Sequence, residues 1–216
     1  PAPIQILPHL WFRNTWSWTA NAEKPHLELT SNIAGVASIE ADGLYFGKRH
    51  LYCENASDVL FTENETNNQQ LYQAPNSTGF AKDGIGEFVI RNKTEAENKK
   101  KTGTKAAAHY GLEIGAGESA FIRLRLSDKE FSGTGKQSSK NIFKDFDKVF
   151  EQRKKEADVF YAEIIPESLS TVAKTVMRQS LAGMLWSKQY YHYEVKAWLD
   201  GDAVHPPPPE NRKEGR

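Results

Sequence analysis

Apolar and polar residues alternate in short runs up to Leu126, and this period of two predicts a series of β-strands. The first strand is expected to run from Ile4 to Trp18, with a bend near Arg13-Asn14. Further strands are expected at 27–29, 36–40, 43–46, 50–53, 59–62, 86–91, 105–114 and 119–126. The segment 71–82 is expected to be a loop, and 92–105 a solvated excursion.

Glycines and polar runs mark the turns between these strands. Asp42-Gly43, with alternation on either side, predicts a β-hairpin, and Gly115-Ala-Gly117 is expected to join 105–114 and 119–126 as paired strands. Glu63-Asn-Glu-Thr-Asn-Asn68 could coordinate a hard cation through oxygen, but its spacing matches no EF-hand loop. Asn-rich turns satisfy themselves by local hydrogen bonds, so we expect a polar loop facing a neighbouring domain, and no metal.

From Asn141 the period changes to 3.6 residues and predicts two helices. The first covers about five turns and has a charged outer face of ordinary composition. After Pro166, a single helix is expected from Ser170, its N-cap, to Trp198. Its buried stripe is expected to consist of Ala173, Val176, Met177, Leu181, Met184 and Leu185.

Strands that come first and helices that come last indicate a mainly β chain, a β-sandwich followed by two α-helices. We expect the sandwich domain at 1–140, a linker helix at 141–166, and a helix with a polyproline segment at 167–216. The sequence opens on Pro1, and a strand pattern is present by Ile4. The sandwich is therefore expected to lack its first strands, and the sequence to be a piece of a longer protein.

Aromatic and polar side chains share the same turns at the end of the last predicted helix. The aromatic ones are Trp186, Tyr190, Tyr191, Tyr193 and Trp198, and the polar ones are Lys188, Gln189, His192 and Glu194. A sugar offers an apolar C–H face for stacking and hydroxyls for hydrogen bonds, so this mixture suits a sugar-binding surface. An amphipathic helix that docks a neighbouring domain remains the alternative.

The N-terminal strand poses the same choice on a smaller scale. Trp16 and Trp18 lie close to Arg13 and Asn14. The aromatic rings can pack a sandwich face, or they can form a rim that stacks a sugar while Arg13 and Asn14 donate hydrogen bonds.

Composition narrows the function classes. Lys plus Arg and Asp plus Glu both number 28, so bulk charge favours neither a nucleic acid nor an anionic membrane as partner. The single Cys53 excludes an internal disulfide and fits a reducing compartment. No apolar run approaches the roughly 20 residues of a membrane span. We expect a cytoplasmic protein, and the sequons at Asn55, Asn64, Asn76 and Asn92 would matter only in a secreted one.

Four strings resemble bacterial proteins related to glycoside hydrolase family 63. They are LPHLWFRNTWSW at 7–18, LFTENETNN at 60–68, GTKAAAHY at 103–110, and LAGMLWSKQYYHYEVKAWLDGD at 181–202 with the PPPPENRKEGR that follows. The resemblance implies a supersandwich-like β-sandwich that leads into a catalytic (α/α)6 barrel absent from this sequence. It also implies hydrolysis of α-linked glucosides or related oligosaccharides with inversion, without a cofactor, in a bacterial cytoplasm.

The resemblance places both catalytic carboxyls C-terminal to Arg216, so no catalytic residue is expected here. Asp200 and Asp202 lie in a turn and are expected to be ordinary turn residues. Substrate contacts are expected from Trp186 by stacking and from Lys188, Gln189 and Tyr190 by hydrogen bonds, followed by Arg13 and Trp16. The other hypotheses are a carbohydrate-binding sandwich without catalysis, and a purely structural domain.

Overall fold

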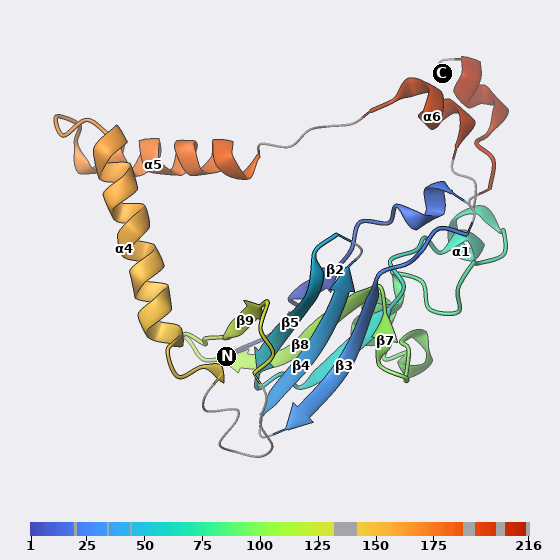
Figure 1. Ribbon diagram of the computed structural model, residues 1–216, viewed down its shortest axis with the longest axis horizontal. Coiled ribbons are helices and arrows are strands. Elements are labelled where there is room, and N and C mark those ends of the chain that lie inside the picture. The colour runs from blue at the N-terminus through green and yellow to red at the C-terminus, as the bar shows by residue number, and fades with distance from the viewer. Residues whose placement is uncertain are drawn as a thin grey trace. The chain divides into compact units, whose positions relative to one another are not determined.

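A computed structural model describes the chain except for Ala20, Ala34, Leu44, 132–141, 188–192, 202–205 and 215–216. The chain divides into two compact units, one formed by 1–142 with 196–216 and the other by 143–195. Most strands of the first unit are labelled in Figure 1.

The first sheet of unit 1 is built on β8 (Lys105–Ile114). β6 (Asp58–Thr62) pairs with β8, as do β1 (Ala2–Ile6) and β2 (His9–Trp11), all antiparallel. β1 and β2 keep one register, because Ala2 faces Ile114 and His9 faces Ala107. They are one strand interrupted at Pro8, which lacks a backbone N–H but accepts a hydrogen bond from the backbone of Ala108.

The second sheet has the order β7-β3-β4-β5-β9 and is also antiparallel. Its strands are β3 (His26–Ile33), β4 (Val36–Gly43), β5 (Gly47–Glu54), β7 (Thr102–Gly103) and β9 (Leu124–Ser127). A hairpin is present in this region, but β4 continues through Asp42 and Gly43, which pair with Lys48 and Gly47. The predicted turn at Asp42-Gly43 and the predicted strand at 43–46 are therefore wrong, and Tyr45 and Phe46 lie in the turn.

Two strand predictions are wrong, one in its pairing partner and the other in its length. β9 pairs with β5 in the second sheet instead of with β8, so the Gly115–Gly117 turn crosses between sheets and closes no hairpin. Beyond Trp11 the predicted N-terminal strand stops, and Trp16–Trp18 form the 3-10 turn η1. The Trp16 indole is buried there and donates a hydrogen bond to Glu65. A period-two alternation of apolar residues does not predict such a contact.

One cluster of buried side chains draws on both sheets. Leu27, Ile39 and Cys53 come from the second sheet, and Phe61 and Ala108 come from the first. Each of these five side chains is fully excluded from solvent. Strand alternation therefore directs one face of each sheet into common apolar packing.

The other face of the first sheet is covered by α2 (Gly84–Arg91), where a strand was predicted at 86–91. Ile85 packs against Leu60 and Ala107, and Phe88 and Val89 join it from the same helical side. Positions 85, 88 and 89 follow the helical period, and Glu87 pairs with Arg91 one turn away at 3.0 Å. The predicted loops at 71–82 and 92–105 also contain part of the short helix α1 (Asn68–Tyr72), the 3-10 turn η2 (Thr94–Ala96) and β7.

Unit 2 consists of α4 (Phe146–Ile164) and α5 (Thr171–Trp186), both visible in Figure 1. The two helices are joined through Arg178, which lies 2.6 Å from the Asp158 carboxylate and 4.8 Å from the ring centroid of Tyr161. The Ser170 N-cap is confirmed, since its hydroxyl accepts a hydrogen bond from the Ala173 backbone at 3.3 Å.

The prediction of one helix from Ser170 to Trp198 is wrong. α5 ends at Trp186, and α6 (Val195–Asp200) is a separate helix, followed by the 3-10 turn η3 (Glu210–Glu214). The predicted buried stripe of α5 is also incorrect in part, because Val176, Met184 and Leu185 are exposed. Ala173, Met177 and Leu181 are half-buried.

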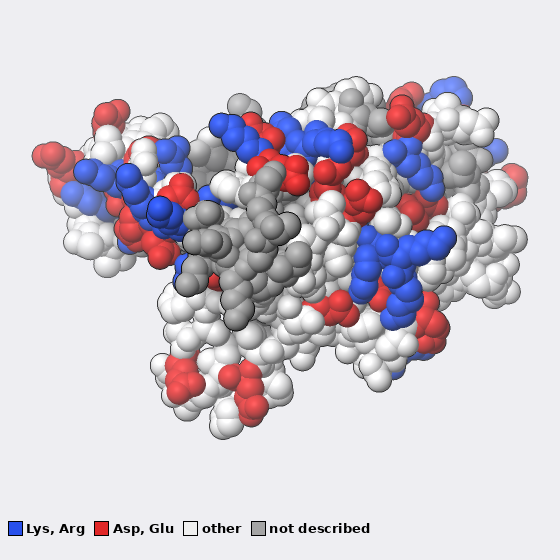
Figure 2. All heavy atoms as spheres, turned by 60° about the horizontal axis from the view of Figure 1, so that its bottom comes forward, with Lys and Arg blue, Asp and Glu red and all other residues white. Residues whose placement is uncertain are grey.

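Helix accounts for 35% and strand for 27% of the described residues, so the mainly β class is not confirmed although two sheets are present. Among the described helices, none is both long and apolar enough to cross a membrane. Figure 2 shows basic and acidic side chains interspersed over the face in view, as equal numbers of the two would suggest.

Candidate functional site

Segments far apart in the sequence meet next to the end of β6. The Asn14 side-chain amide donates to the Asn64 carbonyl at 3.0 Å, and the Asn64 amide donates to the Phe12 carbonyl at 2.9 Å. The Thr104 hydroxyl accepts from the Asn64 backbone at 2.7 Å and donates to Glu63 at 2.8 Å. Residues from 7–18, 60–68 and 103–110 thus form one hydrogen-bonded network.

Glu65 is the buried centre of this region, with 4% of the residue exposed. Its carboxylate accepts hydrogen bonds from the Trp16 indole at 2.9 Å, from the Lys24 ammonium and from the Ser77 hydroxyl. Burial raises the pKa of Glu65, but the hydrogen bonds from Lys24, Ser77 and Trp16 outweigh it, and the net pKa is lowered. These donors therefore favour the ionised form of Glu65 and hold its carboxylate in place.

The predicted sugar-binding residues of the N-terminal segment have different environments. Trp16 is 5% exposed and engaged with Glu65, so its ring is not open for stacking. Trp18 is 51% exposed and carries the guanidinium of Arg13 over its ring at 5.1 Å. The available aromatic face beside Arg13 is thus that of Trp18, whereas the sequence-based prediction chose Trp16.

The remaining predicted contacts belong to the other end of the chain. Trp186, the last residue of α5 in unit 2, is 86% exposed. Lys188, Gln189 and Tyr190 lie outside the described residues, so their roles stay predictions. Asp200 was expected in a turn but is the last residue of α6, where a hydrogen bond from Lys196 lowers its pKa. Asp202 lies outside the described residues.

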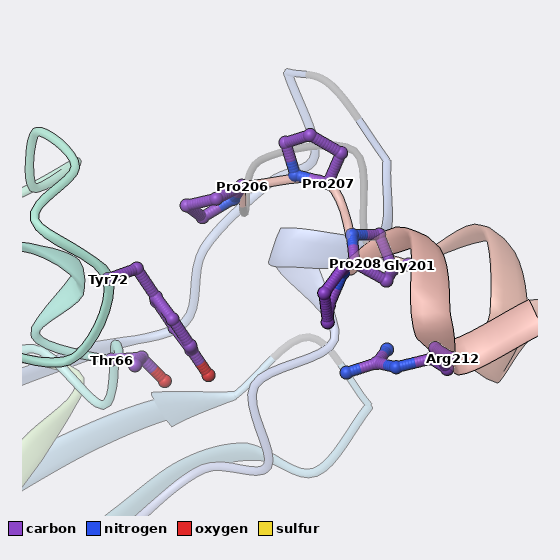
Figure 3. A pocket seen from close by; sticks show the side chains of 8 residues that line it. Thr66, Tyr72, Gly201, Pro206, Pro207, Pro208 and Arg212 are labelled. Atoms are coloured by element: carbon purple, nitrogen blue, oxygen red, sulfur yellow. The ribbon is translucent and has the colours of Figure 1, made fainter. Parts of the chain in front are cut away.

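A cavity of about 290 Å³ opens beside the Glu65 region in unit 1. Thr66, Tyr72, Gly201, prolines 206–209 and Arg212 line it. In Figure 3 the hydroxyl of Tyr72 and the guanidinium of Arg212 face each other across the space, with the prolines above them. The cavity combines pyrrolidine rings with a few polar groups, a composition common in small-molecule sites.

The polar loop 63–68 is occupied by protein contacts. Asn67 caps α1 through the Gln70 backbone at 3.1 Å and donates to Asp83 at 2.8 Å. Among the described residues, no group of three His, Cys, Asp or Glu side chains is placed to hold a metal ion. Cys53 is buried, which raises the pKa of its thiol to about 12, so it is not a thiolate nucleophile near neutral pH.

Sequence reasoning missed Lys24 and Ser77, because neither lies near Glu65 along the chain. Glu65 itself was noticed only as a possible cation ligand. A usable signal was the pair of carboxylates directly after an apolar strand, since a carboxylate at that position must find donors if the loop packs. The sequence does not say which donors those are.

Comparisons with known proteins add one relative. The chain is 31% identical over 239 aligned positions to YMR196W of Saccharomyces cerevisiae, a protein described as uncharacterized. The match covers 99% of this chain, which spans 22% of the length of the yeast protein. No protein-family model matches the chain, and no solved structure does.

Proposed function

We propose that this chain is a non-catalytic, sheet-bearing part of an inverting glycoside hydrolase that acts on α-linked glucosides or related oligosaccharides. The observation that carries the proposal is the meeting of three family-like strings, 7–18, 60–68 and 103–110, in one network around Asn64 and Glu65. Segments that pack together around buried polar groups suit a part whose role is to support a separate catalytic domain.

The chemistry of the carboxylates supports a non-catalytic role for this chain and a catalytic role for a separate domain. Inversion needs one protonated carboxyl as acid and one carboxylate as base, roughly 6.5–9.5 Å apart with room for a water. Glu65 has a lowered pKa and three donors, and Glu63 accepts a hydrogen bond from Thr104, so both suit a supporting role. We propose that the acid and base lie on an (α/α)6 barrel outside this sequence.

The shared apolar cluster of the two sheets supports a β-sandwich as the architecture of unit 1. Substrate contacts are proposed for Trp186, for Lys188, Gln189 and Tyr190, and for Arg13 with the neighbouring Trp18. Trp16 is proposed to act indirectly by fixing this segment through Glu65.

A comparison of two polypeptides tests the proposal. This 216-residue chain and a version extended beyond Arg216 would be assayed on α-linked glucosides, following release and anomeric configuration of the sugar. We expect hydrolysis with inversion only by the longer protein. Hydrolysis by the 216 residues alone, or none by the longer protein, would contradict it.

A structural role without sugar contact is the second candidate, and the burial of Trp16 favours it. In the longer protein, Trp186→Ala separates the two. A fall in rate or affinity supports a substrate contact, whereas unchanged rate and unchanged binding support the purely structural domain. Specific sugar binding by the short chain without any hydrolysis by the longer one would indicate a binding module.

A further inference from the structure

The guanidinium of Arg212 lines the cavity beside Tyr72, and contacts with Trp198 hold it in position. Arg212 stacks on Trp198 with 4.7 Å between the guanidinium carbon and the ring centroid. One of its amino groups donates to the Trp198 carbonyl at 2.9 Å. A guanidinium carries five N–H donors, so several remain for the cavity toward which it points in Figure 3.

The wall opposite Arg212 supplies hydroxyl groups. Tyr72 points its hydroxyl into the space, and Thr66 lies next to it. Within the described part of the chain, Tyr72 has no hydrogen-bond partner for this hydroxyl, although its side chain lines the cavity. Both hydroxyls can donate to an acceptor that lies between them and Arg212.

Two lysines lie beyond Thr66. The Lys82 ammonium donates to the Thr66 hydroxyl at 3.3 Å, and the Lys105 ammonium donates to the Lys82 carbonyl at 3.3 Å. Desolvation and the charge of Lys82 lower the pKa of Lys105, while Asp83 opposes this effect. The nearby carboxylates have partners of their own, since Asp83 accepts a hydrogen bond from Asn67, Glu65 from Lys24, and Asp200 from Lys196.

The proline side of the cavity depends on Gly201. A Cβ built on Gly201 would lie 2.7 Å from Cδ of Pro208, and the positive φ of 78° disfavours other residues. Glycine therefore lets the proline tract close over the space. Prolines have no N–H to donate, so the donors around the cavity come from side chains.

We propose that this cavity binds a small organic acid, with its oxyanion between Arg212 and the Tyr72 hydroxyl and its ring against the prolines. Arg212 is the positioning and charge-neutralising group, because a guanidinium can bind a carboxylate or a phosphate through two parallel hydrogen bonds. This assignment is independent of the proposed hydrolase function, because the groups that line the cavity take part in binding only and break no bond.

Titration of the 216-residue chain with glucuronate, glucose and inorganic phosphate, followed by NMR and calorimetry, tests the assignment. We expect saturable binding of glucuronate with shifts at Thr66 and Tyr72, and much weaker binding of glucose, which has no charge. Arg212→Gln should weaken glucuronate binding about tenfold or more, as for loss of a charge-assisted hydrogen bond. Arg153→Gln, an exposed arginine of α4 paired with Glu156, is the matched control and should leave affinity unchanged.

Two further variants keep the assignment testable if Arg212→Gln disturbs the fold, which circular dichroism would reveal. Tyr72→Phe removes only a hydroxyl and should weaken binding a few-fold, and Gly201→Ala should abolish binding by displacing Pro208. Tighter binding of glucuronate than of phosphate would support the proposed contact between the ring and the prolines, whereas equal binding of the two would overturn that contact. Absence of saturable binding, or equal binding of glucose and glucuronate, would overturn the proposal.

Discussion

Glu65 illustrates how single residues fix this fold. Its carboxylate is almost fully removed from water, and Trp16, Lys24 and Ser77 reach it from three parts of unit 1. A buried charge is tolerated only when hydrogen bonds and an opposite charge replace its hydration. The network therefore ties the N-terminal segment to the loop after β6 through a contact whose loss leaves polar groups unsatisfied.

We predict that Glu65→Gln lowers the free energy of unfolding by about 1–3 kcal/mol, because the indole and ammonium donors lose a charged acceptor. Chemical denaturation of the 216-residue chain, followed by tryptophan fluorescence, would measure the change in the free energy of unfolding. Glu95→Gln, at an exposed position of η2, is the control and should stay within about 0.5 kcal/mol of the wild type. Equal stabilities of the two variants would show that the network contributes nothing.

The same variant has a defined pH signature. Because the pKa of Glu65 is lower folded than unfolded, its contribution is present above the unfolded pKa of about 4.3 and is lost as pH falls through the folded pKa. The wild type should thus lose stability below about pH 5 more steeply than Glu65→Gln. Parallel pH profiles would contradict the lowered pKa.

At the scale of elements, α2 shows how a close backbone approach constrains one residue of a helix. A Cβ on Gly84 would lie 2.2 Å from the Ala96 carbonyl oxygen and 3.2 Å from the Thr62 methyl carbon. A Cβ on Gly86, two residues later in the same helix, would meet nothing within 4 Å. The two glycines share a helix and differ only in what surrounds them.

We predict opposite effects of alanine at these two positions. Gly84→Ala should cost about 1–3 kcal/mol, because the backbone of 96 cannot yield as a side-chain tip could. Gly86→Ala should stabilise by up to about 1 kcal/mol through helix propensity. Thermal unfolding of both variants would check this, and a Gly84→Ala protein as stable as Gly86→Ala would rule out the close approach.

Alternation along the sequence was sufficient to predict β6, β8 and the central parts of β4 and β5, because their inward side chains share one apolar core, but it misplaced the turn between β4 and β5. It could not assign 86–91, where apolar residues in a short run fit a strand or a helix equally. The helix prevails because Ile85, Phe88 and Val89 together cover Leu60 and Ala107. That choice depends on a partner surface elsewhere in the chain.

The candidate site was predicted only in part for a related reason. Aromatic and polar composition drew attention to Arg13 and Trp16, but the structure gives them different partners, because Trp16 is bonded to Glu65 and Arg13 lies over the ring of Trp18. Which tryptophan is buried depends on Glu65, Lys24 and Ser77, whose convergence is a tertiary event. The cavity at Arg212 needs Thr66 and Tyr72 to approach a segment that follows them by more than 100 residues in the sequence.

At the scale of the whole chain, the two units differ in how they are stabilised. Unit 1 contains the shared apolar core, whereas none of the side chains of α4 or α5 is buried. On α5, Val172, Val176 and Met184 are separated by four and eight residues, which places them on one side of the helix, and all three are exposed. Apolar residues on one helical side without cover give little protection against local opening.

We predict a corresponding contrast in amide hydrogen exchange of the 216-residue chain. Amides of β4, β5 and β8 should exchange slowest, and those of α4 and α5 should exchange faster by orders of magnitude. Mass spectrometry on peptic fragments would measure this. In the extended protein proposed above, slower exchange in α5 is expected if further polypeptide covers it, and equal protection of both units in the short chain would contradict the prediction.

The ladder between β1 and β8 also has a kinetic meaning. Ala2 pairs with Ile114, so closing that ladder brings together positions more than 100 residues apart, at a large cost in chain entropy. The hairpin of α4 and α5 needs only local contacts and can form before the sheets do, while its apolar side is still exposed to solvent. Refolding from denaturant would then pass through a stage in which helices precede sheets, the stage most prone to self-association.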